Sequence, residues 1–317
     1  MPELMPELMP DLMPDLMRPA PPRRTRTRPP APVPRAADRA FCAAVARRAV
    51  RSLYAELTLY PKPGLVSLVD NGSHDDMTAA TFLRSLFALR HYFREITRAG
   101  MEDAPFASLR SLGIAAEARM LRATGGINTH RGAVFCVGLL CAAIGACRTR
   151  GTPLTASAIR ATLLLRWADA LAAHSQPAGG DSHGLRAARR YAASGAREEA
   201  ALGLPSVFEV ALPALRGALG AGLGARRARV DALFALMAHI SDTNLYHRGG
   251  PQGASTARRH AQAFIDAGGS AAEGWEARAL ACHRVFVAQR LSPGGAADLL
   301  AAACLVQDVC QDAGKVS

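Results

Sequence analysis

The sequence contains few aromatic residues. Only 5% of its 317 residues are Phe, Trp or Tyr, although 50% are apolar and many of these are alanine. β-Sandwiches and β-barrels depend on aromatic and β-branched side chains, so this composition argues against an all-β protein. Because alanine is the best helix former, the composition favours closely packed helices.

Lysine is also nearly absent, with only Lys62 and Lys315 among 38 basic residues. The net charge of +12 comes from arginines that are spread along the chain. Proteins that bind nucleic acid concentrate such charge on one surface, so we expect no general nucleic-acid binding. The Arg-rich linker over residues 18–37 is the exception, and could bind DNA independently of any other activity.

No two of the seven cysteines have C-x-x-C spacing, and their number is odd. This usage argues against a disulfide framework or a zinc site and indicates a reducing compartment. The longest apolar run, residues 133–146, has 14 residues and is too short to span a bilayer. The N-terminus lacks the pattern of a signal peptide. We therefore expect a soluble, cytoplasmic protein.

The first 17 residues repeat the tetrapeptides MPEL and MPDL, and a Pro/Arg-rich stretch follows. Proline at every fourth position prevents a regular helix, and nothing in this tail could form a core. We predict a disordered tail over residues 1–37 and one folded domain over residues 38–317.

From Asp38 onward, apolar residues recur with the period of an α-helix, and no segment shows sustained apolar/polar alternation. A first helix carries an apolar face from Cys42 to Leu57, and a second begins near Thr78 and ends at Gly100. Further helices are expected over about 107–123, 130–148, 155–174, 183–194, 206–220, 228–240, 252–267, 271–290 and 294–311. The sequence therefore predicts a single all-α domain.

Five polar segments between these helices carry the candidate functional residues. In the first, residues 60–78, Lys62 lies between two prolines, and its compact ammonium suits a phosphate. His74, Asp75 and Asp76 follow, and carboxylate oxygens suit magnesium. Alternatively, the two aspartates only stabilise the start of the next helix.

The second segment, residues 124–136, places two glycines before Asn128, His130 and Arg131 at the start of an apolar helix. Free N–H groups at a helix start, beside Arg and His, favour an anion. A tight turn with a capping side chain is the alternative.

The third segment contains Arg197, Glu198 and Glu199 between glycines. Paired carboxylates can bind a metal or act as a general base. They could equally form a solvated helix start.

The fourth segment places Asp242, Asn244, His247 and Arg248 before two glycines, Gly249 and Gly250. The fifth contains the turn Ser292-Pro-Gly-Gly, and Asp298 enters the first turn of the last helix. Taken by itself, this segment indicates only the start of a helix. Together the five segments carry the Asp, Lys, His and Arg typical of a magnesium–nucleotide site.

The segments PKPGLVSLVDNGSHDDM, GINTHRGAVF, GAREEAALGLPSV, DTNLYHRGG and SPGGAADLLA occur in this order. They resemble the triphosphoribosyl-dephospho-coenzyme A synthase family over about residues 40–312. The chain is more similar to the malonate decarboxylase branch than to the citrate lyase branch, and lacks the holo-transferase domain fused to some citrate lyase versions. It departs slightly from the family at Arg131, where lysine is frequent, and at Ala296, where serine is frequent.

The resemblance implies a pentosyltransferase that expels adenine from ATP and joins the triphosphoribosyl group to the 2′-hydroxyl of 3′-dephospho-CoA. Magnesium would accompany ATP as the cofactor. The product would pass to a holo-acyl-carrier transferase as the precursor of a prosthetic group for an acyl-carrier subunit. No membrane partner is expected, and self-association into a homo-oligomer is left open.

We hypothesise the following roles from this chemistry. The magnesium ligands are Asp75, Asp76 and Asp242. The candidate base is Glu198 or Glu199, and the candidate proton donor to adenine is His74, His130 or His247. The substrate-binding candidates, among which Lys62, Arg131 and Arg248 would hold phosphates, are Lys62, Gly64, Asn128, Arg131, Arg197, Asn244, Arg248, Gly249, Gly250, Gly294 and Gly295.

Two other classes of protein are weighed against this one. His74-Asp75 suggests a helical, metal-dependent phosphohydrolase, but such a site needs an upstream histidine and His74 is the first in the chain. A non-catalytic helical binding module, in which the polar segments only cap helices, would bind neither ATP nor dephospho-CoA.

Overall fold

The structure, a computed structural model, describes residues 35–175 and 195–313, so residues 1–34 of the predicted disordered tail and the predicted helix 183–194 lie outside it. The last two residues of the predicted tail, Ala36 and Ala37, belong to the first helix. The described residues contain eleven α-helices and no strand, which confirms the all-α prediction. The helices are α1 (Ala36–Leu57), α2 (Ala79–Met101), α3 (Phe106–Thr124), α4 (Arg131–Thr149), α5 (Ala156–Ser175), α7 (Ala196–Ala201), α8 (Leu212–Gly220), α9 (Gly224–His239), α10 (Thr243–Asp266), α11 (Trp275–Ala288) and α12 (Gly294–Ala313). A π-helical turn, η1 (Ser206–Ala211), precedes α8, and a short 3₁₀ turn, η2 (Gly269–Ala271), precedes α11.

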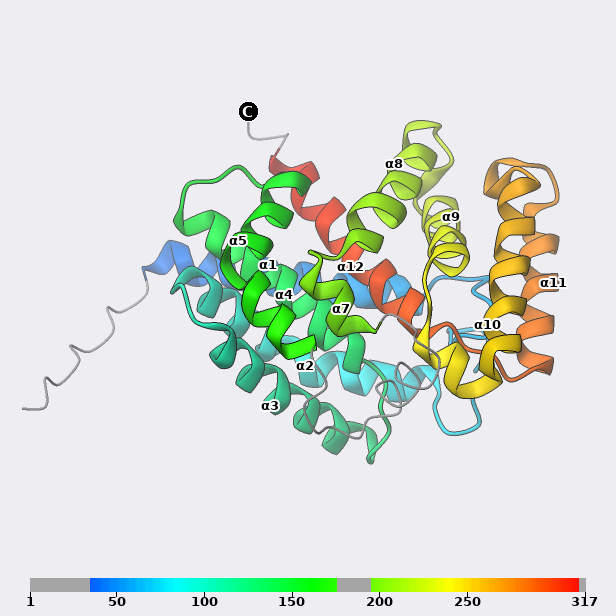
Figure 1. Cartoon of the computed structure of the whole chain (residues 1–317), viewed down its shortest axis with the longest axis horizontal. Coiled ribbons are helices and arrows are strands. Elements are labelled where there is room, and N and C mark those ends of the chain that lie inside the picture. The colour runs from blue at the N-terminus through cyan, green and yellow to red at the C-terminus, as the bar shows by residue number, and fades with distance from the viewer. Residues whose placement is uncertain (1–34, 176–194, 314–317) are drawn as a thin grey trace, which may run out of the picture. The chain divides into compact units, whose positions relative to one another are not determined.

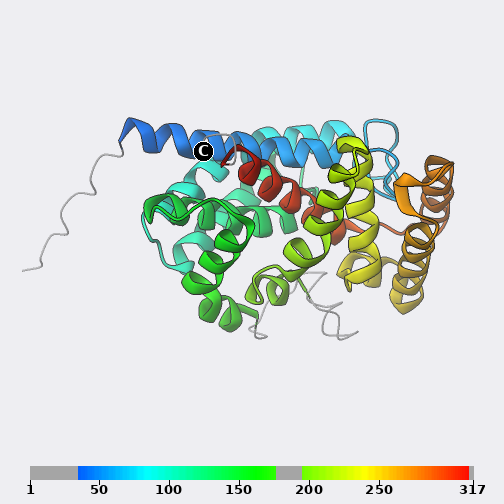
Figure 2. The same cartoon turned by 90° about the horizontal axis from the view of Figure 1, so that it is seen from above.

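Helix α4 lies in the interior and packs against α1, α2, α3, α5 and α12 (Figures 1 and 2). Within the described ranges it alone is long and apolar enough to cross a membrane, but 78% of its most apolar window is buried inside the protein. Its apolar side chains are therefore accounted for by the core of a soluble helical protein.

The second helix ends at Met101, one residue beyond the predicted end at Gly100. A Cβ atom at Gly100 would collide with the backbone of Ala142 on α4, and a Cβ at Gly145 would collide with the backbone of Thr97 on α2. The two glycines therefore let α2 and α4 pack backbone against backbone. The predicted start of α2 is confirmed, since Thr78 is its N-cap.

Two predicted boundaries also differ. The segment predicted as one helix over 206–220 is divided into the π-turn η1 and α8. The fourth polar segment, expected to be a loop, forms the first turns of α10, which kinks at Gly250 (φ 59°, ψ −159°) before Pro251. Only glycine readily adopts this backbone conformation, and the following proline cannot continue the hydrogen-bond ladder, so the kink has a local cause.

Candidate active site

Asp242 joins the N-termini of α10 and α12. Its Oδ1 accepts hydrogen bonds from the backbone N of Asn244 at 2.9 Å and from Asn244 Nδ2 at 3.1 Å. Its Oδ2 accepts one from the backbone N of Ala296 at 3.1 Å. Asp242 is only 3% exposed, and burial raises the pKa of its carboxyl group while these N–H donors oppose the rise. Both oxygens therefore already serve as helix caps, and a metal role for Asp242 stays a prediction.

The glycines predicted to bind substrate at the start of α12 make room for this arrangement. A Cβ at Gly295 would lie 3.0 Å from Asp242 Oδ2, and a Cβ at Gly294 would lie 2.9 Å from Asn244 Nδ2. Side chains here would therefore push Asp242 and Asn244 away from α12.

Asp298, just after the first turn of α12, lies against the N-terminus of α4. It accepts a hydrogen bond from the backbone N of Ala133, and a Cβ at Gly132 would lie 3.0 Å from Asp298 Cγ and still closer to Oδ2. Part of the residue is exposed, yet desolvation is the largest cause that raises the pKa of Asp298 well above its usual range, followed by the charges of Glu56 and Asp242. In the sequence alone Asp298 indicates only a helix start, so it is not among the predicted site residues.

Lys62 is buried and paired with Glu56, at the end of α1. Its Nζ lies 2.6 Å from Glu56 Oε1 and donates to the Glu56 carbonyl oxygen at 2.9 Å. The two residues are 1% and 5% exposed. Desolvation lowers the pKa of Lys62, and the Glu56 carboxylate opposes this shift. Glu56 was missed because it stands within an apolar helical pattern, and a buried acid next to Leu57 gives no signal until its partner is known.

His130 is a buried imidazole held at one nitrogen. Its Nδ1 lies 2.7 Å from Ser85 Oγ, while its Nε2 is buried and has no hydrogen-bond partner among the described residues. Desolvation, followed by the charge of Lys62, lowers the pKa of His130 to about 3, so the ring is neutral at physiological pH. Because buried polar atoms are rarely left unpaired, Nε2 is a natural contact for a substrate atom or a water molecule.

A second cluster lies at the surface and joins the first, fourth and fifth polar segments. His74 Nδ1 lies 2.9 Å from Arg248 Nη2, and His74 Nε2 lies 2.8 Å from Ser292 Oγ. Arg248 Nη1 also donates to the carbonyl oxygen of Ser73 at 3.1 Å, and Asp76 Oδ1 lies 3.6 Å from His74 Nδ1. Burial, followed by the Arg248 charge, lowers the pKa of His74 to about 4.

Two of the predicted glycines provide space for Leu291, which precedes this turn. Gly64 has φ +68°, and a Cβ there would collide with the Leu291 carbonyl oxygen. A Cβ at Gly249 would lie 2.6 Å from Leu291 Cδ2. Ser73 Oγ donates to the same carbonyl oxygen at 2.6 Å, so the first segment is hydrogen-bonded to the residues that precede α12.

In the third segment the two glutamates have different surroundings. Glu198 is exposed, whereas Glu199 is half-buried and accepts hydrogen bonds from Ser206 N at 2.7 Å and from Ser206 Oγ at 3.1 Å. Desolvation raises the pKa of Glu199, and the Ser206 donors oppose the rise. Both Glu199 and Asp298 influence the pKa of Cys136 on α4, so the third segment faces the same helix as the fifth. Arg197 instead donates to the His174 carbonyl oxygen at 3.3 Å.

Other predicted residues lie at the surface. Arg131 Nε pairs with Glu117 Oε2 at 3.1 Å, and the Arg131 backbone N donates to Asn128 Oδ1 at the same distance. His247 is exposed on α10. Asp75 is exposed and lies 3.5 Å from Arg290 Nη2.

The three predicted magnesium ligands do not form one ligand group. Asp75 and Asp76 are exposed on a loop, whereas Asp242 is buried and its oxygens accept N–H donors. Within residues 35–175 and 195–313, no three His, Cys, Asp or Glu side chains are arranged to hold a metal ion. The donor set therefore does not fit a metal bound by Asp242 together with the loop aspartates.

Comparison with known proteins identifies relatives over nearly the whole folded region. The family model described as CitG, ATP:dephospho-CoA triphosphoribosyl transferase, matches residues 42–316. The chain is 42% identical over 267 residues to a Pseudomonas aeruginosa protein (82% of this chain, 88% of that protein), named "Probable 2-(5''-triphosphoribosyl)-3'-dephosphocoenzyme-A synthase". It is 39% identical over 263 residues to the "2-(5''-triphosphoribosyl)-3'-dephosphocoenzyme-A synthase" of Pectobacterium atrosepticum (80% of this chain, 85% of that protein). No solved structure matches.

The matched region contains all five polar segments. Four of them meet at the start of α12, through Gly132 with Asp298, Asp242 with Ala296, and His74 with Ser292. The chain belongs to the family of ATP:dephospho-CoA triphosphoribosyl transferases.

Proposed function

We propose that this triphosphoribosyl transferase transfers the triphosphoribosyl group of ATP to 3′-dephospho-CoA, with release of adenine, around the start of α12. The observation that carries this location is the meeting of four polar segments, far apart in the sequence, at the start of that helix. The N-termini of α4, α10 and α12 also meet there, and helix N-termini favour anions. Asp242 and Asp298 use some of these N–H groups, so cationic side chains must supply the remaining attraction for a triphosphate.

Arg248 and Arg131 are the best placed cations for the phosphates. Arg248 lies at the surface between the first and fifth segments, and Arg131 begins α4. Lys62 is buried and bound to Glu56, so it serves to balance the carboxylate of Glu56 rather than to contact phosphate directly. We therefore propose Arg131 and Arg248, and not Lys62, as the direct phosphate contacts.

The reaction breaks the bond between adenine and C1 of its ribose and forms a bond from that carbon to the 2′-oxygen of dephospho-CoA. The attacking hydroxyl loses its proton to a base, and the departing adenine gains one from an acid. Glu199 is the proposed base, because burial raises its pKa and a stronger base accepts the proton more readily. Asp298 is the proposed acid, because it holds its proton to higher pH than an ordinary carboxyl group.

His130 is better suited to binding than to proton donation. With a pKa of about 3 it carries no spare proton, but its neutral ring can form a hydrogen bond through Nε2. We propose that Nε2 contacts the nucleotide, with Ser85 holding the ring in place. His74 and His247 then belong to the surface around the site.

Magnesium is proposed to enter with the triphosphate, where it neutralises phosphate charge. Asp75 and Asp76 are the carboxylates open to such an ion, and they lie near Arg248, whose pKa is lowered by burial against the opposing effect of these two charges. We further propose the malonate decarboxylase branch, a cytoplasmic location and delivery of the product to a holo-acyl-carrier transferase, all supported by the resemblance of the five segments.

The test is to incubate the protein with ATP, dephospho-CoA and magnesium, and to look by mass spectrometry for free adenine and the triphosphoribosylated conjugate. Both products are expected. Adenine alone would indicate a nucleotide N-glycosidase, and neither product from folded protein would contradict the proposal. Asp298→Asn should lower the rate of both products by about 100-fold or more, since it removes the acid, and an unchanged rate would exclude Asp298.

The branch is tested separately. Purified acyl-carrier subunits of malonate decarboxylase and of citrate lyase are offered the product together with a holo-acyl-carrier transferase. Complementation of a host that lacks its own synthase should restore malonate decarboxylase activity. Restoration of citrate lyase alone would contradict the branch assignment.

A further inference from the structure

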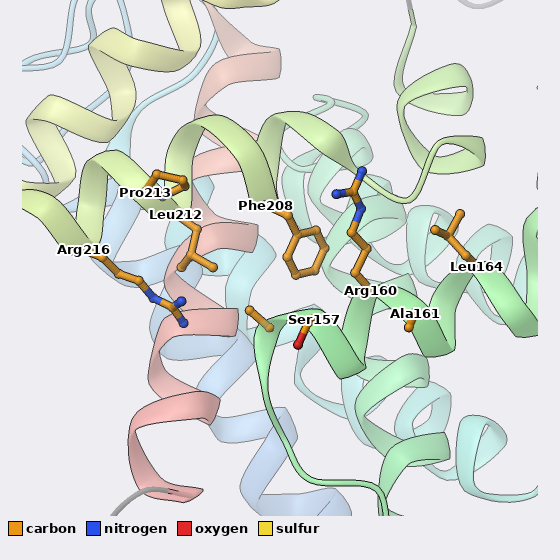
Figure 3. A pocket seen from close by; sticks show the side chains of 9 residues that line it. Ser157, Arg160, Ala161, Leu164, Phe208, Leu212, Pro213 and Arg216 are labelled. Carbon is orange, nitrogen blue, oxygen red and sulfur yellow. The ribbon is translucent and has the colours of Figure 1, made fainter.

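A cavity of about 470 Å³ lies between α5 and the segment formed by η1 and α8 (Figure 3). Arg160 and Leu164 of α5 form one wall, and Phe208, Leu212 and Arg216 form the other. None of the residues predicted from the five polar segments lines it. Its size lies within the range of about 300–1,000 Å³ that is typical of small-molecule sites.

The lining has an apolar middle with a cation on each side. Figure 3 shows the Phe208 ring between Arg160 and Leu212, with Arg216 at the far end. The Arg160 guanidinium lies 5.9 Å from the centroid of the Phe208 ring, and its Nη1 pairs with Glu209 Oε1 at 2.6 Å. Arg160 Nε is buried and has no hydrogen-bond acceptor in the described part of the chain. No acidic side chain is among the lining residues, although Glu209 pairs with Arg160 beside them, so the cavity suits a ligand with an uncharged, partly apolar body and an anionic group that competes with Glu209 for Arg160.

The cavity adjoins the proposed base. Glu199 binds both the backbone N and the hydroxyl of Ser206, the first residue of the π-turn that carries Phe208. A Cβ at Gly203 would lie 2.9 Å from Leu164 Cγ, so the turn after Glu199 packs directly on the cavity wall. Single π-turns are frequent at functional sites, and here the turn connects the carboxylate of the third segment to the cavity.

We infer that this cavity holds the phosphopantetheine arm of dephospho-CoA. The inference rests on the proposed function, which places the 2′-hydroxyl of this substrate at Glu199. The arm leaves the same nucleotide through a diphosphate, and Arg160 is the lining cation whose charge acts on Glu199 by lowering its pKa. Phe208, Leu212 and Pro213 offer apolar surface to the methyl and methylene groups of the arm. Arg216 then donates to an amide carbonyl oxygen at the far end, since the arm has no charge there.

ATP fits this cavity less well. Its triphosphate is expected at Arg248 and Arg131, which are not among the lining residues, and the adenosine has no long apolar extension to fill the middle. The two substrates would therefore approach Glu199 and Asp298 from different sides, as a direct transfer between them requires.

The test uses 4′-phosphopantetheine as a probe and Phe208→Ala as the variant. In the wild-type enzyme the probe should inhibit competitively against dephospho-CoA but not against ATP. Phe208→Ala should raise both the inhibition constant of the probe and the KM for dephospho-CoA by about tenfold, because apolar contact is lost. The KM for ATP should not change. Phe87→Ala, which truncates a phenylalanine that is 65% exposed on α2, is the matched control and should change none of these constants.

Arg160→Gln and Arg216→Gln are further variants that keep the Phe208 ring, in case its removal disturbs folding. Each should raise the KM for dephospho-CoA several-fold and leave that for ATP unchanged. Equal constants for wild type and all three variants, or a probe that competes with ATP, would overturn the inference. Calorimetric binding of the probe, measured beside conjugate formation, distinguishes a failure of the cavity assignment from a failure of the proposed function. Absence of conjugate in the wild type refutes the proposed function, whereas normal conjugate formation with probe binding insensitive to the variants refutes only the cavity assignment.

Discussion

Gly132, near the start of α4, and Asp298, just after the first turn of α12, are in such close contact that no side chain fits at position 132. A Cβ there would lie 3.0 Å from Asp298 Cγ and closer to Oδ2. The contact lets the backbone N of Ala133 donate to Asp298. It also explains why a glycine stands directly after the first residue of α4, where alanine would otherwise be the better helix former.

Gly132→Ala should therefore displace Asp298 and lower both stability and activity. We expect the free energy of unfolding to fall by about 1–3 kcal/mol, as for other overpacked sites, with at least a tenfold loss of adenine release. The measurements are urea unfolding and the adenine assay. Gly217→Ala in α8 is the matched control, because no atom lies within 4 Å of its added Cβ. That change should instead stabilise the protein by about 0.5–1 kcal/mol, and equal effects of the two variants would contradict the packing argument.

Glu199 and Glu198 form a natural pair for testing the base. Glu199→Gln should lower kcat by about 100-fold or more, because a neutral amide cannot accept the proton of the attacking hydroxyl. The amide oxygen can still accept a hydrogen bond from the backbone N of Ser206, so the turn should persist. Glu198→Gln should have little effect, because Glu198 is exposed. A larger loss in the Glu198 variant would reverse the assignment.

His130 should make the protein sensitive to acid. Its pKa in the folded state is lowered from 6.5 to about 3, so between these values the unfolded state binds the proton and the folded state does not. The stability of the wild type therefore falls as the pH falls through this window. Between pH 7.5 and 5, the wild type should lose about 2 kcal/mol more than His130→Asn in the free energy of unfolding.

The control for this experiment is His91→Asn, which changes an exposed histidine on α2. This variant should follow the wild type at both pH values. Urea unfolding at pH 7.5 and pH 5 gives the comparison. If wild type and His130→Asn lose the same amount, the imidazole is not held neutral as the geometry implies.

Lys62 and Glu56 should be strongly coupled. Lys62→Met leaves a buried carboxylate without its cation, and breaking such a pair destabilises proteins by about 3–5 kcal/mol. Adding Glu56→Gln removes the uncompensated charge and should restore most of this loss. A double-mutant cycle on the free energy of unfolding measures the coupling, and additive effects of the two changes would show that the pair is not formed.

Local sequence determined the fold class of this protein. The helical period of residues such as Cys42, Leu53 and Leu57 is a property of neighbouring positions, so it can be read without knowing how the helices pack. The N-cap at Thr78 and the positions of the five polar segments follow from equally local preferences. The same segments were sufficient for the family resemblance, which the comparisons bear out.

Only the tertiary structure decided which polar side chains are buried and what they touch. Ser85 and Asp298 gave no signal because their partners, His130 and Gly132, are far away in the chain. Glu56 lies only six residues from Lys62, and it was the burial of this pair that gave no signal. The role of Gly100 is likewise a tertiary one, since it admits the backbone of Ala142. Desolvation and helix–helix contact are consequences of packing, and residues 40 or more positions apart can meet without leaving any periodic trace in the sequence.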